Sequence, residues 1–427
     1  MCRSCGVPAH SPDTGTVAIR TPRFAALRQR DSRSYLIGTA LAMMADNIEH
    51  VITYWVLWQT FHSPALAGFQ VISHWLPFLL FSVLSGSLAD RYDCRRLIQG
   101  AQVLFMAVSL SWGLLFWTGS LQIWHACVLL VLHGCAGALW GPAEQMMLHD
   151  FATRDELPGA VRLNATFRSL GQLCGPVVGS GLLLLLGSTA GILANILIYL
   201  PLTIFLFRTR FTGHLRDGIV VRTRTGFVGM LRAARGVPLG PTLTSMIVLA
   251  GLGSFFVGSS LQSAMPEFAE SLGAGSAGVA YGVLLFANGV GGVVGGLVLE
   301  ATGWLRPTVR GAVACTAIYG VTSLVFAVGD SYPLAVSALV IGGVASLAAM
   351  SITQTVVQLQ APPADRGRIL GLYSTSAGGL RIGSGFTVGL AGAAIGLHRS
   401  LAVSAAALIL GALAAGAYAL RSAAGRR

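Results

Sequence analysis

The chain has 427 residues, of which 54% are hydrophobic and only 10% charged, and its mean hydropathy is +0.70. Soluble domains carry about 25% charged residues, so a soluble enzyme of this size would lack the polar surface it needs. The 28 Lys and Arg residues are all arginine, which excludes a Walker A phosphate loop and a lysine Schiff base. Because these arginines cluster between apolar runs, the net charge of +12 indicates cytoplasmic membrane loops rather than nucleic-acid binding.

The apolar runs predict an all-α membrane protein with about 12 transmembrane helices. Each run is long enough to cross the roughly 30 Å core of a bilayer. The runs lie near 35–60, 67–89, 97–118, 121–148, 160–187, 190–207, 241–263, 276–299, 309–328, 331–357, 369–396 and 399–420. The polar first 34 residues contain no apolar segment of a signal peptide. We expect this tail to be unstructured; the alternative, a metal or redox role for Cys2 and Cys5, lacks a second cysteine pair.

Arginine is frequent in every second loop and rare in the others. The arginine-rich segments precede the first run, follow the second, fourth, sixth, eighth and tenth runs, and close the chain. The loops between them have almost no arginine, with Arg399 as the exception. The positive-inside rule therefore predicts that both termini and the central loop face the cytoplasm. We expect a multi-pass protein of the cell inner membrane with an even number of spans.

The two halves of the chain repeat at an offset of 210 residues. Gly86, Asp90, Arg96, Asp155, Gly175 and Gly179 recur as Gly296, Glu300, Arg306, Asp365, Gly385 and Gly389. Parallel halves of this kind are a transporter architecture. We predict a cytoplasmic N-terminal tail (1–34), a six-helix bundle (35–207), a central cytoplasmic loop (208–240), a second six-helix bundle (241–420) and a cytoplasmic C-terminal tail (421–427).

The loop after the second run reads Gly-Ser-Leu-Ala-Asp-Arg-Tyr-Asp-Cys-Arg-Arg from Gly86 to Arg96. Gly86 would let another helix approach closely, and an acid beside arginines can pair with them or cap a helix. The segment resembles the G-x-L-A-D-R loop of the major facilitator superfamily, and the resemblance covers the chain from about residue 33. It implies that Asp90 and Arg91, in a motif completed by Arg95 and Arg96, form a latch against helix 11. A basic loop that only sets the topology is the alternative.

A second motif in the fifth run comprises Gly171, Gly175, Pro176 and Gly179. Proline kinks a helix and small residues permit close packing. The motif resembles the antiporter motif that major facilitator exporters carry; ordinary small-residue packing is the alternative.

Further segments are similar to the bacterial exporter branch that includes enterobactin exporters and macrolide efflux pumps. They are Gly141-Pro142-Ala143, Asp155-Glu156-Leu157, the run from Arg162 to Thr166, and Pro362-x-x-Asp365-Arg366-Gly367-Arg368. Glu144 departs from the arginine usual in that branch. The resemblance assigns Asp365, Arg366 and Arg368 to the conformational motif before helix 11.

Three titratable residues share one face of the first predicted helix. Asp46 lies near the bilayer midplane, and Glu49 and His50 follow at i+3 and i+4. Burying a carboxylate in lipid is expensive, so this face should line a cavity or the bundle interior. We hypothesise that Asp46 and Glu49 carry a coupling proton. The alternatives are a substrate contact and a structural pair with His50 or a distant arginine.

Other charges lie inside the predicted helices. Arg381 needs a partner, either a carboxylate of the first helix or an anionic substrate, unless it extends to the cytoplasmic surface. Arg168 lies nearer the cytoplasmic end, where extension to the surface is favoured. Glu144 is a candidate for gating or pairing. No metal site is predicted, because no metal-ligand spacing is present among His62, His74, His125, His133 and His149. Each of these histidines is expected to be an interior or interfacial residue with its hydrogen bonds satisfied.

Together these features predict a secondary transporter, not an enzyme, that exports an amphipathic small molecule such as a drug, siderophore or secondary metabolite. Proton influx would drive it by alternating access. The expected partners are the small-molecule substrate, protons and membrane lipids, with no nucleic acid and no cofactor, and we expect a monomer. An importer of the same fold is the main alternative, and a non-transporting membrane sensor or enzyme is a more distant one.

Overall fold

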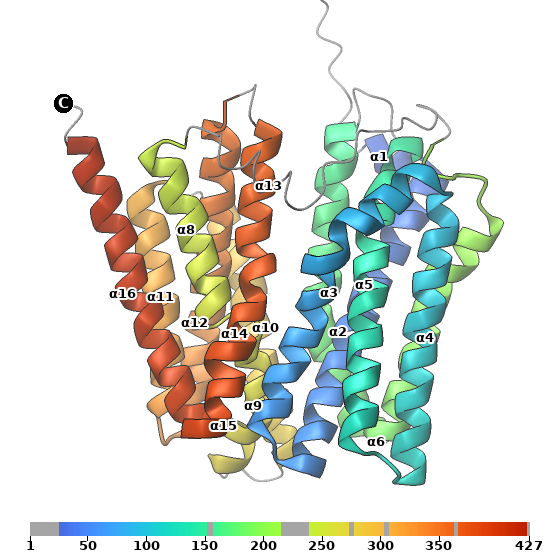
Figure 1. Cartoon of the computed structure of the whole chain (residues 1–427), viewed down its shortest axis with the longest axis horizontal. Helices are drawn as coiled ribbons and strands as arrows, with labels where there is room; N and C mark the ends of the chain where they lie inside the picture. Colours follow the sequence, from blue (N-terminus) through green and yellow to red (C-terminus); the bar gives the residue numbers. More distant parts are fainter. Residues whose placement is uncertain are drawn as a thin grey trace, which may run out of the picture.

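The computed structural model describes residues 25–151, 157–214, 239–272, 277–302, 307–362 and 366–424, and every regular element in these ranges is a helix (Figure 1). The helices are α1 (Ala25–Arg28), α2 (Arg30–Phe61), α3 (Pro64–Arg91), α4 (Cys94–Thr118), α5 (Ile123–Phe151), α6 (Leu157–Arg208), α8 (Pro241–Phe256), α9 (Ser260–Ser271), α10 (Ala277–Thr302), α11 (Val309–Val328), α12 (Tyr332–Gln360), α13 (Arg366–Ala377), α14 (Ile382–Ser384), α15 (Ala391–Ile395) and α16 (Leu397–Ala424). A 3-10 turn, η1 (Gly379–Arg381), and a π-helical segment, η2 (Gly385–Leu390), connect α13 to α15.

The described helices follow the course of the twelve predicted runs. Eight stretches are long and apolar enough to span a membrane. One of them, Leu163–Arg208, holds two helices, because the backbone turns at Gly187 with φ 77°. The other three predicted runs correspond to α2, α10 and the interrupted rod from α13 to α15. Side chains on the outside, such as Leu185 and Leu410 at 84% and 68% exposed, suit contact with lipid tails rather than water.

Two predicted helices are interrupted. The run predicted at 241–263 is α8 and α9, which are separated by a turn at Gly258. Gly258 has a φ of 38°, a conformation that suits glycine and ends the α8 hydrogen-bond ladder. The run predicted at 369–396 changes from α to 3-10 to π geometry between Gly379 and Leu390. Such changes put irregular backbone beside the centre of the molecule, where it is tolerated only within protein or against a cavity.

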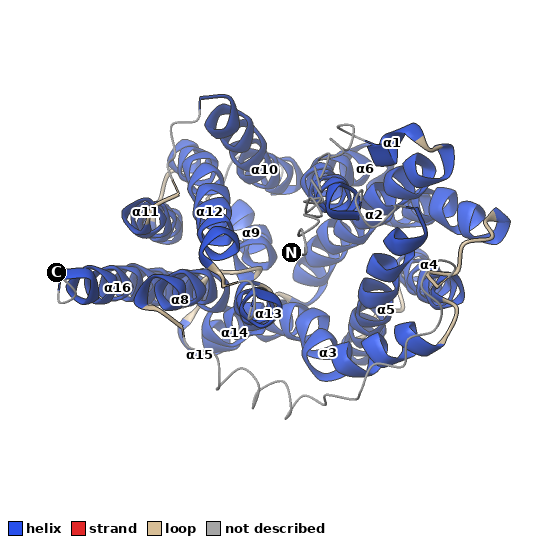
Figure 2. Cartoon of the chain, turned by 90° about the horizontal axis from the view of Figure 1, so that it is seen from above, coloured by secondary structure: helices blue, strands red, loops and turns tan. Residues whose placement is uncertain are grey.

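The helices form two groups that stand side by side. Elements α1 to α6 make one group and α8 to α16 the other (Figures 1 and 2). Both ends of the described chain lie at the same end of the molecule, at the top of Figure 1. We refer to this as the terminal end and to the opposite one as the far end.

The two groups contact each other closely toward the far end. Gly68 on α3 packs on Gly385 and Gly389 in η2, and a Cβ built on Gly389 would overlap the Cα of Gly68. Glu270 on α9 accepts hydrogen bonds from the indole of Trp58, at 2.8 Å, and from the amide of Gln59, both at the end of α2. These contacts join the two groups at that end.

Candidate functional site

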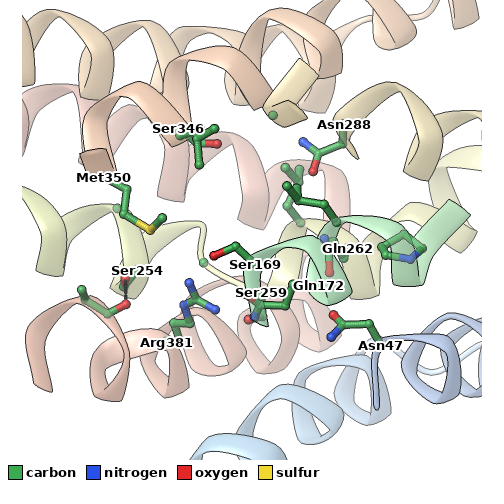
Figure 3. Close-up of a pocket in the computed structure, with 18 of the residues that line it drawn as sticks. Asn47, Ser169, Gln172, Ser254, Ser259, Gln262, Asn288, Ser346, Met350 and Arg381 are labelled. Carbon is green, nitrogen blue, oxygen red and sulfur yellow. Dashed lines mark hydrogen bonds between the residues drawn. The ribbon is translucent and has the colours of Figure 1, made fainter. Parts of the chain in front are cut away.

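A cavity of about 440 Å³ lies between the two helix groups. Its lining comes from α2 to α6 on one side and from α8 to α13 with η1 on the other. Figure 3 shows polar side chains of both groups directed toward this space. They include Asn47, Ser169, Gln172, Ser254, Ser259, Gln262, Asn288 and Ser346. Aromatic residues, among them Tyr54, Trp75 and Tyr319, complete the wall. A lining of this mixed kind suits a ligand with both apolar and polar parts.

His133 joins two of the predicted acidic residues. Its Nε2 lies 2.8 Å from Asp46 Oδ1, and its Nδ1 lies 2.8 Å from Glu49 Oε1. A histidine that donates from both ring nitrogens carries two ring protons and a positive charge. With Asp46 and Glu49 both ionised, the imidazole donates to each and places one cation between two carboxylates, which compensates their charge within the helix bundle.

The bridge is buried on the Glu49 side and open on the Asp46 side. Glu49 is buried and accepts a further hydrogen bond from the Ser109 hydroxyl of α4. Asp46 lines the cavity, together with His50. The predicted shared face of α2 thus turns toward α4, α5 and the cavity, which agrees with the expectation that these charges avoid lipid.

Two further histidines surround Asp46. His50 Nε2 lies 3.9 Å from Asp46 Oδ2, and the ring of His50 is 4.7 Å from that of His74 on α3. Asp46, His50, His74 and His133 each offer a ligand atom, and these atoms lie within 4.8 Å of one another. Folding therefore brings His74 and His133 to the predicted acids, and His133 lies in the interior with both ring nitrogens hydrogen-bonded.

His133 and His74 could not be paired with the acids by spacing, because His133 is 87 positions from Asp46. The one available signal was their position: both interrupt long apolar helices far from either end. An ionisable residue inside a membrane helix is a functional candidate by default, and that rule would have selected both.

Arg381 faces the cavity from η1. Its guanidinium lies 5.0 Å from the centre of the Trp75 ring, a cation–π contact that crosses between the two helix groups. No described carboxylate lies within ion-pair distance of it. Of the two partners expected from the sequence, the first-helix carboxylate is thus not in contact with Arg381, which leaves its charge directed at the cavity.

Glu144 and Arg168 form an ion pair. Arg168 Nη1 lies 3.0 Å from Glu144 Oε2, and its guanidinium stacks on Trp140 at 4.8 Å. Glu144 is fully buried and also accepts a hydrogen bond of 2.6 Å from Asn164. The expectation that Arg168 extends to the surface is wrong, because this buried acid holds it at the cavity wall. Of the two roles considered for Glu144, pairing is the one that the contacts display.

The loop motif after α3 makes local contacts at the terminal end. Asp93 caps α4 by accepting from the Arg95 N–H at 2.9 Å, and it pairs with the Arg95 guanidinium at 3.0 Å and with Arg96 at 4.0 Å. Arg91 is exposed. Within the described part of the chain, nothing lies within 4 Å of a Cβ built on Gly86, and the close approach of another helix at this glycine stays a prediction.

Several predicted motif residues cannot be placed. Asp365 lies outside the described residues, as do the two tail cysteines, Cys2 and Cys5. Asp90, Arg366 and Arg368 belong to described helices, but their side chains lie outside the described part of the chain. The latch implied for Asp90 and Arg91 stays a prediction.

The glycine motif of α6 packs on α2. A Cβ on Gly171 would overlap the carbonyl of Ala40, and one on Gly175 would overlap Asn47. Gly179 faces Val51, and a Cβ built on Gly179 would lie 3.1 Å from the Cβ of Val51. Pro176 lies among them and lines the cavity. The motif therefore holds the helix that carries Asp46 against the helix that carries Arg168.

Comparison with known proteins identifies the fold and the family. The protein family described as Transmembrane secretion effector (MFS_3) matches residues 21–425. Among curated proteins, the Staphyloferrin A transporter of Staphylococcus aureus (strain NCTC 8325 / PS 47) is 21% identical over 169 residues. That alignment spans 39% of this chain and 43% of the relative.

Solved transporter structures share the fold over nearly the whole chain. A bacterial homolog of the human lysosomal transporter Spinster, in an inward-facing and unoccupied conformation, aligns with a TM-score of 0.68 and 17% identity, covering 92% of this chain and 98% of that one. The nucleoside transporter NupG aligns with a TM-score of 0.68 and 12% identity, covering 91% and 99%. The protein is a multi-pass membrane transporter of the major facilitator type, and it belongs to the Transmembrane secretion effector family.

Proposed function

We propose that this transporter exports an amphipathic, anionic small molecule from the cytoplasm in exchange for protons. The observation that carries the proposal is the cavity between the helix groups: Arg381 lies in the wall formed by one group, and Asp46 of the Asp46–His133–Glu49 bridge lies in the wall formed by the other. One wall offers a site for an anion and the other a site for protons.

Arg381 supports the anionic character of the substrate. A guanidinium recognises carboxylate or phosphate through paired hydrogen bonds, and a buried cation requires such a partner. The neighbouring rings of Trp75 and Tyr319 would contact apolar parts of the same molecule. Siderophores, acidic drugs and acidic secondary metabolites combine these properties, and the partial similarity to a staphyloferrin A transporter agrees with this class.

The hydrogen bonds of His133 support proton coupling. A carboxyl group that takes up a proton no longer accepts at that oxygen, so protonation of Asp46 would release His133 Nε2. Because Asp46 lies on α2 and His133 on α5, the proton would change how these helices are held together. Coupling requires such a link between protonation and helix arrangement.

Two features favour export over import. The glycine–proline motif of α6 resembles that of family exporters, and the matching family is described as a secretion effector. If the arginine-rich terminal end faces the cytoplasm of the cell inner membrane, as the positive-inside rule predicts, the far end is closed to the outside. The cavity would then be poised to load substrate from within.

The experiment is a comparison of metabolites inside and outside native-host cells with and without the gene, by mass spectrometry. Export predicts a compound that accumulates inside deletion cells and is depleted from their medium. Restoring the gene should reverse both changes, whereas the Arg381→Ala gene should not. A compound that instead remains unconsumed in the medium and is missing inside deletion cells would show uptake and overturn the proposed direction.

A further inference from the structure

We propose that Asp46, His50, His74 and His133 form a binding site for one divalent transition-metal ion in the cavity wall. The inference goes beyond the proposed export function, since it concerns a ligand of another class. Three imidazoles and one carboxylate are donors typical of Zn²⁺, Co²⁺, Ni²⁺ and Fe²⁺ sites, whereas Mg²⁺ and Ca²⁺ prefer oxygen ligands throughout.

The geometry requires only small movements to close around an ion. The four ligand atoms lie within 4.8 Å of one another. Bonds of about 2.1 Å in a tetrahedron separate ligand atoms by about 3.4 Å, so the widest pair must approach by roughly 1.4 Å. His133 Nε2 and Asp46 Oδ1, now 2.8 Å apart, would give up the shared proton and separate slightly to admit the ion.

His74 supplies an independent observation. Its Nδ1 is buried and has no hydrogen-bond partner in the described part of the chain. A buried polar atom without a partner is unfavourable by about 1–3 kcal/mol and is uncommon in folded proteins. The rings of His50 and His133 lie 4.7 and 5.7 Å from the His74 ring. Small rotations of His74 would point a ring nitrogen at the space that these residues share.

Glu49 provides the outer partner that metal-bound histidines usually have. It holds His133 through Nδ1 at 2.8 Å, which leaves Nε2 as the nitrogen that faces Asp46. This carboxylate–histidine arrangement fixes the tautomer and raises the basicity of a ligating imidazole. Ser109 in turn holds Glu49 in place.

All four ligands of the site belong to one helix group, and the site is accessible from the cavity. Asp46, His50 and His74 line the cavity, so an ion can enter from it. All four residues lie on α2, α3 and α5. The ligand set therefore stays together if the two groups move relative to each other, and binding does not require the exported molecule.

The test measures Zn²⁺ binding to the purified full-length protein, freed of its purification tag and treated with a chelator, by competition with a chromophoric zinc indicator. We expect about one ion per chain and at least tenfold weaker binding in His74→Gln and in His50→Gln. His125→Gln, a histidine at the exposed start of α5, is the matched control and should bind as the wild type does. Elution from a size-exclusion column would verify that each variant is folded.

X-ray absorption at the zinc edge identifies the ligands. The proposal predicts nitrogen and oxygen neighbours at about 2.0–2.1 Å with three imidazoles, reduced to two in His74→Gln. A sulfur shell at about 2.3 Å, lost in Cys2→Ser/Cys5→Ser, would assign the ion to the tail cysteines and overturn the proposal. No binding at all, or equal binding in His74→Gln and wild type, would overturn it too. Absent binding with intact export would leave the proposed function standing, and binding without export would reject that function alone.

Discussion

His133 Nε2 lies 2.8 Å from Asp46 Oδ1, although 87 positions separate the two residues in the chain. The contact links α5 to α2 at the wall of the central cavity. Through its other nitrogen the same ring contacts Glu49, so one imidazole lies between two carboxyl groups, of which Glu49 is buried and Asp46 lines the cavity. A change in protonation at this bridge would alter both the charge of the cavity and the hydrogen bond that joins α5 to α2.

Replacing His133 with Gln should strongly destabilise the protein, because Asp46 and Glu49 would face each other without a cation. Removing one partner of a buried charged network typically lowers stability by about 3–5 kcal/mol. Thermal unfolding in detergent measures the effect. The triple variant Asp46→Asn/Glu49→Gln/His133→Gln should recover most of the loss; if it is no more stable than His133→Gln, the charge explanation is wrong.

A double-mutant cycle should reveal strong coupling between Glu144 and Arg168. Glu144 is fully buried and Arg168 Nη1 lies 3.0 Å from it, so Glu144→Ala leaves a cation at the cavity wall without its partner. We expect Glu144→Ala to be more destabilising than Glu144→Ala/Arg168→Met, by about 1–3 kcal/mol. Additive effects in thermal unfolding would show that the pair contributes nothing as a pair.

Gly389→Leu should separate the two helix groups at the far end, because any Cβ at this position overlaps Gly68 on α3. Spin labels on Thr60→Cys and Ser271→Cys, both exposed at that end, would report a longer distance by electron–electron double resonance. Gly100→Leu is the matched control, since nothing lies within 4 Å of its Cβ position. An unchanged distribution in Gly389→Leu would mean that the glycine contact does not hold the far end closed.

Arg381→Ala should weaken binding of the exported molecule. A hydrogen bond to a charged group is worth about 1.5–3 kcal/mol, which corresponds to roughly a 10- to 150-fold loss of affinity. Isothermal titration calorimetry with the compound identified by metabolite analysis measures the dissociation constant. Arg381→Lys keeps the charge but not the paired donors, so its affinity should lie between those of the wild type and Arg381→Ala. Arg310→Ala, on an exposed arginine at the start of α11, should change nothing.

The course of the helices could be predicted from two features of the sequence. The apolar runs have the length needed to cross a bilayer, and the arginines mark the loops between them. The predicted run at 309–328 coincides with α11. The interruption at Gly258 could not be foreseen in the same way, because a single glycine among 54 carries little information about local conformation. Close packing against neighbouring helices decides which glycines break a helix.

The candidate site was predictable only in part. Asp46, Glu49 and His50 follow one another on one helix, so their common face can be derived from helical geometry. The residues that meet them, His74 and His133, come from other helices, and their positions depend on how α3 and α5 pack on α2. The pairing of Arg168 with Glu144 is likewise a property of the packed bundle and not of either segment.

The central claim, exchange of substrate for protons, is tested most directly by reconstituting the purified protein in liposomes that contain a pH-sensitive dye and the exported compound. The account predicts that efflux of the compound drives protons inward and acidifies the lumen. This signal should be absent in Asp46→Asn/Glu49→Gln and retained in Asp330→Asn, an acid exposed in the loop before α12. Efflux without any change in lumenal pH, or protons leaving together with the compound, would contradict the account.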